Sequence, residues 1–131
     1  MPTTWRALLV VATAVAAVLL PAAPAPEAQA AARVITYSVT TQGAVRGDLG
    51  TFAMVAHFTL NDPRGWSLGG ALEFHRVPSG GDFTLVLAAP PVIGRQAGCD
   101  AYYSCRVGRN VYVNDDRWRG ATPSWPHGVP Y

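Results

Sequence analysis

Residues 83–89 of this chain are Phe-Thr-Leu-Val-Leu-Ala-Ala, and this stretch decides the fold. It follows Pro-Ser-Gly-Gly at residues 78–81 and is ended by Pro90 and Pro91. A short run that is apolar at nearly every position, between such turn residues, is typical of a strand buried on both faces of a sheet. The sequence therefore predicts a central strand that needs packing on each side.

Four further strands are predicted from shorter patterns. They are residues 34–40 and 71–77, in which apolar and polar side chains alternate, and residues 102–107 and 110–114. The last two flank Gly108 and Arg109, a pair that fits a two-residue turn with glycine first. We therefore expect the chain to finish its sheet with a hairpin.

One amphipathic helix is predicted between the first strand and the second. Asp48 is a good N-cap for a helix that begins at Leu49. Pro63 stops this helix, because the residue before a proline is pushed out of the helical region. The order strand, helix, strand, strand, hairpin predicts the α+β class: a mixed twisted sheet of about five strands with one helix on one face.

That arrangement leaves one face of the central strand without cover. A single helix shields one face only, and after Ala89 the chain offers a short loop between two cysteines, the hairpin and a tail rich in proline and glycine. Each large apolar side chain left in water forfeits about 1.5–3 kcal/mol. Either the tail folds back, or a partner docks, or the domain is incomplete at its C-terminus. The last is favoured, because the chain ends within the proline-rich tail.

The N-terminal residues 1–32 are predicted to be a secretion signal and an Ala/Pro linker, which leaves residues 33–131 for one domain. Residues 7–20 form an apolar run that is shorter than the about 20 residues of a membrane-spanning helix. An Ala-Gln-Ala motif at residues 28–30 fits a cleavage site, so we expect cleavage after residue 30 or 32. The location is then secreted or cell-envelope associated, without a stable membrane span; an uncleaved anchor is the alternative.

Composition disfavours several classes of function. The net charge is +2, and the ten arginines are spread singly along the chain, which disfavours a nucleic-acid binder. The two cysteines, Cys99 and Cys105, are too few for a four-ligand zinc site. In an exported chain they are expected to pair as a disulfide.

Motifs for metal-dependent or nucleophilic catalysis are missing from the sequence. It contains neither H-E-x-x-H nor G-x-S-x-G, and His57, His75 and His127 have no ligand spacing between them. We interpret these three histidines as surface residues. Asn-Asp-Asp at residues 114–116 lacks a calcium-loop pattern, and a cap for a following turn is the better interpretation.

Aromatic residues crowd the end of the chain. Six lie in the last thirty residues: Tyr102, Tyr103, Tyr112, Trp118, Trp125 and Tyr131. Two interpretations stay open. The rings either close the bottom of a small core or form a face that binds sugar or peptide.

Several blocks of residues, in order and spacing, carry a resemblance to a known family. They are Leu60-Asn61-Asp62-Pro63-Arg64-Gly65-Trp66, Phe74-His75-Arg76-Val77, Asp82-Phe83, Tyr102-Tyr103-Ser104-Cys105-Arg106, and Val113-Asn114 with Arg117-Trp118. From about Ile35 onward, the chain resembles secreted actinobacterial domains of unknown function that are regarded as zincin-like metallopeptidases. The resemblance implies the N-terminal half of a zincin-like fold.

The resemblance also implies a binding edge. In such a fold the strand at residues 102–107 is an antiparallel edge that pairs with an extended substrate. Tyr103, Ser104 and Arg106 are carried over as candidates for substrate binding. A complete family member is expected to bind zinc through an H-E-x-x-H helix, which would follow Tyr131.

This chain has no such helix, so it is predicted to be C-terminally truncated. We predict no catalytic residue and no metal ligand in it, no cofactor, and no peptidase activity as given. The expected partner is a peptide or a cell-envelope component. The alternative function is a non-catalytic cell-envelope binding module that uses the C-terminal aromatics, Trp118 and Trp125 among them.

Overall fold

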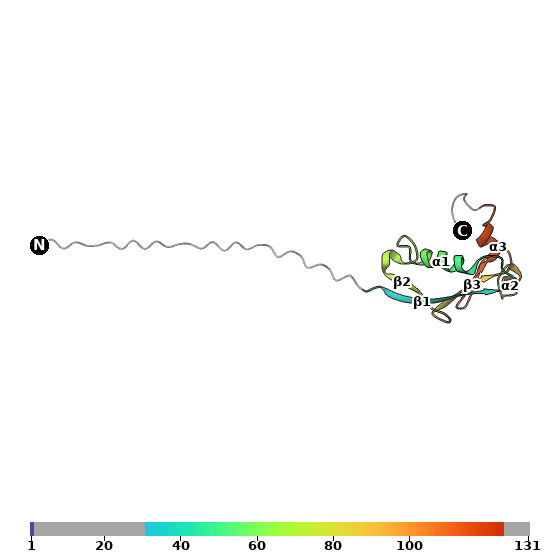
Figure 1. Ribbon diagram of the computed structural model, residues 1–131, viewed down its shortest axis with the longest axis horizontal. Helices are drawn as coiled ribbons and strands as arrows, with labels where there is room; N and C mark the ends of the chain where they lie inside the picture. The colour runs from blue at the N-terminus through green and yellow to red at the C-terminus, as the bar shows by residue number, and fades with distance from the viewer. Residues whose placement is uncertain (2–30, 125–131) are drawn as a thin grey trace.

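The structure is a computed structural model, and it describes Met1 and residues 31–124. The elements follow one another as β1 (Arg33–Gln42), α1 (Leu49–Leu60), the 3-10 turn η1 (Leu68–Gly70), β2 (Leu72–Arg76), β3 (Phe83–Ala88), α2 (Pro90–Gly94), β4 (Cys105–Val107), β5 (Asn110–Asn114) and α3 (Asp115–Gly120). The predicted α+β class is confirmed. Figure 1 shows α1 lying along one side of the sheet, with α2 and α3 at the end far from the start of β1.

The sheet has five strands in the order β2-β1-β3-β5-β4. All neighbouring pairs run parallel except β4 and β5, which are antiparallel. The predicted central strand, β3, lies in the middle, where Val86 pairs with Thr40 on one side and Tyr112 on the other. The two edges of the sheet are therefore β2 and β4.

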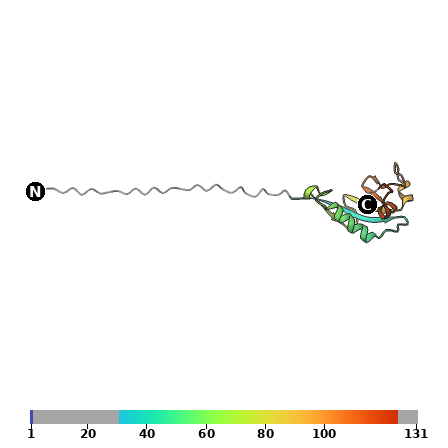
Figure 2. The same ribbon diagram turned by 90° about the horizontal axis from the view of Figure 1, so that it is seen from above.

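Helix α1 covers the first face of the sheet (Figures 1 and 2). It begins as predicted, because the Asp48 carboxylate accepts a hydrogen bond from the Thr51 backbone N–H at 2.7 Å. It ends at Leu60, and the Asn61 side chain both donates to the Phe74 carbonyl and accepts from the Phe74 N–H. The end of α1 is thus joined to β2. Between the helix and the sheet lies a cluster of buried side chains, to which both contribute: Tyr37, Phe52, Phe74, Leu85 and Leu87.

The second face of the sheet is covered by α2 and the loop closed by the disulfide, and this corrects the expectation that nothing covers it. The buried side chains here are Val86, Ala88, Ala89, Val92, Ile93 and Tyr112, with both cysteines packed against them. The disulfide between Cys99 and Cys105 is confirmed, and it is compatible with an extracellular location.

The predicted burial deficit of the central strand is therefore wrong. In β3, Leu85 and Leu87 face α1 and are only 8% and 0% exposed to solvent. Val86 and Ala88 face α2 and are 1% and 0% exposed. Both faces are packed by residues 31–124 alone. Incompleteness of the domain is then an expectation that rests on the family resemblance alone.

Like α2, helix α3 was not predicted from the sequence patterns, which indicate only a capped turn at this point of the chain. Its start agrees with the predicted cap, since the Asn114 side chain accepts hydrogen bonds from the N–H groups of Asp116 and Arg117. Trp118 extends from α3 and meets the ring of Phe52 edge-on, with centroids 5.4 Å apart. Trp118 thus brings α3 against the α1 side of the sheet.

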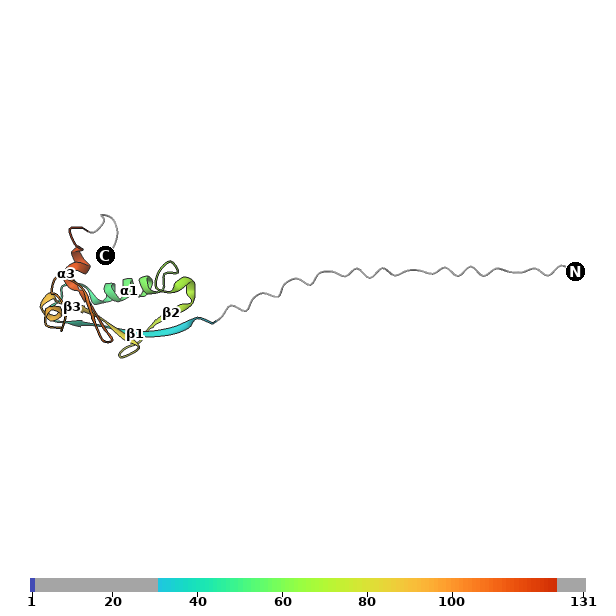
Figure 3. The same cartoon turned by 180° about the vertical axis from the view of Figure 1, so that it is seen from behind.

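None of the helices in the described residues is long and apolar enough to span a membrane. The predicted signal and linker lie almost wholly outside the described residues, as do His127, Trp125 and Tyr131. Seen from behind, β1 starts beside β2 at the end of the domain opposite α3 (Figure 3).

Candidate functional site

The free edge of β4 is the first candidate site. Among residues 31–124 this strand pairs with β5 alone, and it is joined to β5 by the turn at Gly108 and Arg109. Gly108 has a positive φ of 60°, as the first residue of the predicted turn requires. The hairpin is confirmed, but its first strand is shorter than predicted, because Tyr103 N–H bonds to the Asp100 carbonyl in a turn.

Register decides which backbone groups of β4 face outward. In a hairpin closed by a two-residue turn, the residues next to the turn, here Val107 and Asn110, exchange both backbone hydrogen bonds. The pairs alternate, so Arg106, which lies opposite Val111, does not bond to β5. The Arg106 N–H and C=O therefore point away from the sheet, toward any chain that adds to this edge.

The three predicted substrate-binding residues lie at this edge but do different things. Tyr103 is 58% exposed, and its ring packs edge-on against Tyr102. The Ser104 hydroxyl accepts a hydrogen bond from the Asn114 N–H at 3.0 Å, so it ties the chain before β4 to the end of β5. Arg106 is exposed, and its Nε donates to the Gly108 carbonyl at 3.0 Å. No acid among residues 31–124 forms an ion pair with it.

Ser104 and Arg106 share one face of the edge. Cys105 packs with the cluster on the α2 side, and successive side chains of a strand point to opposite faces. Arg106 accordingly lies beside Val111, which packs with the cluster under α1. Of the three candidates, the structure thus brings Ser104 and Arg106 together on the α1 side, and Tyr103 precedes the strand.

An apolar groove continues from Ser104 under α1. We call it the α1–β5 groove; its volume is about 290 Å³, and it is lined by Phe52, Val55, Ala56, Thr59, Leu60, Leu85, Ser104, Val113 and Trp118. The groove has a simple geometric origin. A helix is about 10 Å wide, whereas five strands spaced about 4.8 Å apart make a wider sheet. One helix therefore leaves apolar sheet surface open beside it.

The C-terminal aromatics divide between the two interpretations. Tyr112 is buried, and Trp118 packs on Phe52, so these two rings help to close the core. Tyr102 and Tyr103 are exposed, and the Arg117 guanidinium lies 4.4 Å from the centre of the Tyr102 ring. The exposed pair is available for a binding face, while Trp118 is half-buried and contributes to the wall of the α1–β5 groove.

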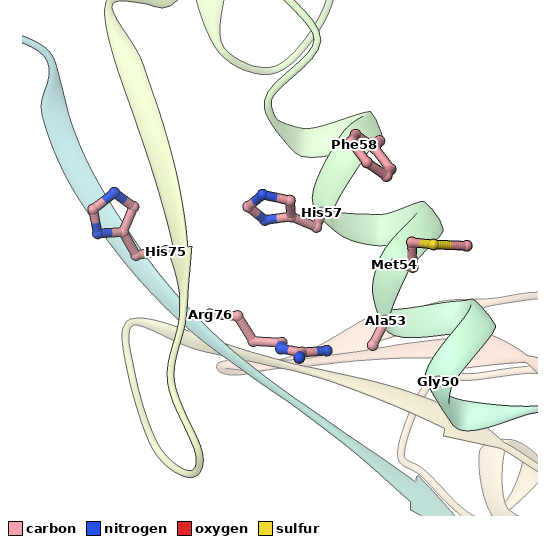
Figure 4. Close-up of a pocket in the computed structure, with 7 residues that line it drawn as sticks. All are labelled: Gly50, Ala53, Met54, His57, Phe58, His75 and Arg76. Atoms are coloured by element: carbon pink, nitrogen blue, oxygen red, sulfur yellow. The ribbon is translucent and has the colours of Figure 1, made fainter.

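A second hollow lies on the other side of α1, next to the edge strand β2. Figure 4 shows His57 of α1 and Arg76 of β2 pointing into it, whereas His75 lies on the opposite side of β2. The Tyr37 hydroxyl lies 3.3 Å from His57 Nδ1. Burial raises the pKa of Tyr37, and the positive charge of Arg76 opposes that effect. His57 and His75 are both exposed, as predicted for surface histidines.

The described residues do not fit a zinc site. Within residues 31–124, no three side chains of His, Cys, Asp or Glu lie together as metal ligands. His75 Nε2 is 2.7 Å from the Glu73 carboxylate, and His57 lies across β2 from this pair (Figure 4). We therefore assign no chemical step to a metal ion in this part of the chain.

Comparison with known proteins identifies the family. A family model described as a protein of unknown function (DUF3152) matches residues 14–127. The chain belongs to the DUF3152 family. No curated protein and no solved structure matches the chain. The DUF3152 match confirms the predicted membership of a family of unknown function, while its actinobacterial source, export and zincin-like relationship stay predictions.

Proposed function

We propose that this DUF3152 chain is a zincin-like domain that binds an extended peptide along the free edge of β4. The observation that carries the proposal is the outward-facing N–H and C=O of Arg106 on an edge strand, beside an apolar groove. Added strands bind in this way, with affinity from main-chain hydrogen bonds and specificity from pockets for alternate side chains. The sheet order supports it, since the resemblance places an antiparallel edge strand here.

The register predicts what the peptide should contain. In an antiparallel addition, the peptide residue that exchanges both main-chain hydrogen bonds with Arg106 lies directly opposite it, and directly paired residues place their side chains on the same face. That side chain therefore lies on the α1 side, next to a guanidinium that has no acidic partner among residues 31–124. We expect an acidic residue at this position.

The neighbouring positions of the peptide should be apolar on one side. A residue two positions along the added strand faces the same side as the acidic one. In the direction of Ser104, it reaches the α1–β5 groove, whose walls include Leu85, Val113 and Trp118. The preferred ligand is thus an extended segment with an acidic residue and an apolar residue two positions apart.

The proposal is limited to binding. The zinc chemistry implied by the resemblance would require ligands that residues 31–124 do not group together, so the proposal includes no hydrolytic step. We also propose that the chain works outside the cytoplasm, which the disulfide supports.

The test compares two substitutions at Arg106. Arg106→Pro removes the outward N–H without touching a bond to β5, because this residue faces away from β5. Arg106→Ala keeps the N–H and removes the charge. With labelled nine-residue peptides in fluorescence polarisation, the proline variant should bind every sequence more weakly than the alanine variant does, because it lacks one more main-chain hydrogen bond. The alanine variant should retain binding and lose the preference for a central acid over a central lysine.

The charge-reversal variant Arg106→Glu provides a further check, because it should prefer the lysine peptide. If no peptide binds the unmodified protein, or if proline and alanine have the same effect, β4 is not a peptide-binding edge.

One observation favours the alternative, a cell-envelope binding module. Tyr102 and Tyr103 are exposed side by side, with centroids 4.9 Å apart, and stacking on exposed rings is a common way to hold a sugar. A pull-down with peptidoglycan that depends on both tyrosines, and not on Arg106, would support this function instead.

A further inference from the structure

We propose that the hollow between α1 and β2, which we call the α1–β2 cleft, binds a carboxylate that carries an apolar group. The cleft has a volume of about 640 Å³ and is lined by Gly50, Ala53, Met54, His57, Phe58, His75 and Arg76 (Figure 4). It lies beside β2, at the edge of the sheet opposite β4. It is thus separate from the peptide edge.

Arg76 lies on the face of β2 that is turned toward the core. Phe74, two residues earlier, is buried under α1, and side chains two positions apart in a strand share a face. Arg76 also pairs in register with Tyr37, which is fully buried. Figure 4 shows the guanidinium extending from β2 toward Ala53 of α1. The positive charge of Arg76 therefore lies on a face of the sheet where its neighbours Phe74 and Tyr37 are buried aromatic side chains.

No counter-charge for Arg76 is found among the described residues. Each acid there accepts hydrogen bonds elsewhere: Asp48 from Thr51, Asp62 from Arg64, Glu73 from His75, Asp82 from Thr36, Asp100 from Tyr102, Asp115 from Arg46 and Gly47, and Asp116 from Arg46 and Arg119. The only one on β2, Glu73, has its side chain on the other face of the strand together with His75. The charge in the cleft is left for a ligand.

The exposed side of α1 at the rim of the cleft carries large apolar side chains, although the solvent-facing side of a helix is usually polar. Met54 and Phe58 are 53% and 69% exposed on α1, one helical turn apart. A ligand with a hydrocarbon or aromatic group would bury both side chains while its carboxylate reached Arg76. Apolar walls with a few placed polar groups are typical of small-ligand sites, and an arginine can hold a carboxylate with two parallel hydrogen bonds.

The deciding experiment uses purified full-length protein and three probes. They are the peptide acid N-acetyl-Leu-Phe, its C-terminal amide and the fatty acid decanoate, each titrated by calorimetry. The acid should bind at least about tenfold more tightly than the amide, because only the acid can form the charged pair with Arg76. Decanoate tells whether a fatty acid or a peptide C-terminus supplies the carboxylate.

Two variants and one control complete the test. Arg76→Gln and Phe58→Ser should each weaken binding of the acid, the first by about tenfold or more. Arg95→Gln, an exposed arginine at the end of α2, should leave it unchanged. Both test residues are exposed, so the folded state is expected to survive. Equal binding of acid and amide, equal effects of the Arg76 and Arg95 variants, or no binding at millimolar probe would each overturn the proposal.

Discussion

Asp115 is expected to be the acid on which the stability of the domain most depends. Its side chain is 2% exposed, and its two carboxylate oxygens each accept a backbone N–H at 2.9 Å, from Arg46 and Gly47. These bonds hold the segment before α1 against the start of α3. Gly47 is needed for this approach, since a Cβ there would lie 2.7 Å from the carboxylate.

The magnitude follows from the two donors. Asp115→Ala leaves both N–H groups without an acceptor, and a partly buried donor left unsatisfied costs about 1–3 kcal/mol. We expect a loss of about 2–6 kcal/mol in the free energy of unfolding, which lowers the melting temperature by about 10 °C or more for a domain of this size. Asp115→Asn keeps one carbonyl acceptor and should fall in between.

The neighbouring acid is the matched control. Asp116 also bonds to Arg46 and Arg119, but through exposed ion pairs, with its side chain 37% exposed. Such pairs contribute about 1 kcal/mol or less. Thermal unfolding followed by circular dichroism separates the two. If Asp115→Ala and Asp116→Ala shift the melting temperature equally, the loop before α1 is not held by the buried carboxylate.

Two further predictions concern the second face of the sheet and the response to acid. Ile93→Ala, at a fully buried position in α2, should lower the free energy of unfolding by about 2–5 kcal/mol. Leu68→Ala, at a position in η1 that is 68% exposed, should change it little. Equal effects of the two substitutions in urea unfolding would mean that α2 does not cover β3. In the folded state, the pKa values of four aspartates lie below their ordinary range. Hydrogen bonds from the backbone N–H groups of Thr51 and Thr36 lower the pKa values of Asp48 and Asp82. Hydrogen bonds from arginines lower the pKa of Asp62 to about 2 and lower the pKa of Asp116. Lowered values stabilise the fold above the unfolded pKa of 3.8, and this contribution disappears as the pH falls from about 4 toward 2. The melting temperature should decline in that window and decline less in Asp62→Asn; a melting temperature that is flat across it contradicts the assignment.

The central strand and the long helix were predictable because single residues decide them. A run as apolar as residues 83–88 fits only a strand between two others, and β3 is that strand. Asp48 and Pro63 bracket α1 through hydrogen bonding and steric exclusion, both local effects. Local chemistry of this kind can be recognised without knowing what packs nearby.

The second layer was not predictable from periodicity. Helix α2 has five residues and begins with Pro90, and so short a segment shows no helical period. The two prolines predict the end of a strand, although proline is also favoured in the first turn of a helix. Pro90, in the first turn of α2, was therefore the one local feature that could have indicated this helix. Helix α3 is mostly charged, and Asp115 is buried only because a loop nearly seventy residues earlier in the chain bonds to it.

The candidate edge could be expected from the sequence only through the family resemblance, and whether it binds a substrate stays a prediction. The resemblance indicated the edge strand and named Tyr103, Ser104 and Arg106, of which only Ser104 and Arg106 lie on one face. The hydrogen bond from Asn114 to the Ser104 hydroxyl, and the groove beneath α1, depend on how β5 and α3 are placed. No pattern in the sequence carries that information, because it arises from contacts between distant segments.

The length of β4 sets the affinity that a peptide can reach at this edge. A strand of three residues presents the outward N–H and C=O of Arg106 alone within its bounds, which allows two main-chain hydrogen bonds. At about 0.5–1.5 kcal/mol each, they supply about 1–3 kcal/mol, less than the about 4–15 kcal/mol that association costs in lost freedom. Backbone pairing alone therefore cannot hold a peptide. Most of the binding free energy must come from the α1–β5 groove, and the charge of Arg106 adds the preference for an acid, so sequence preference should be strong even where binding is weak.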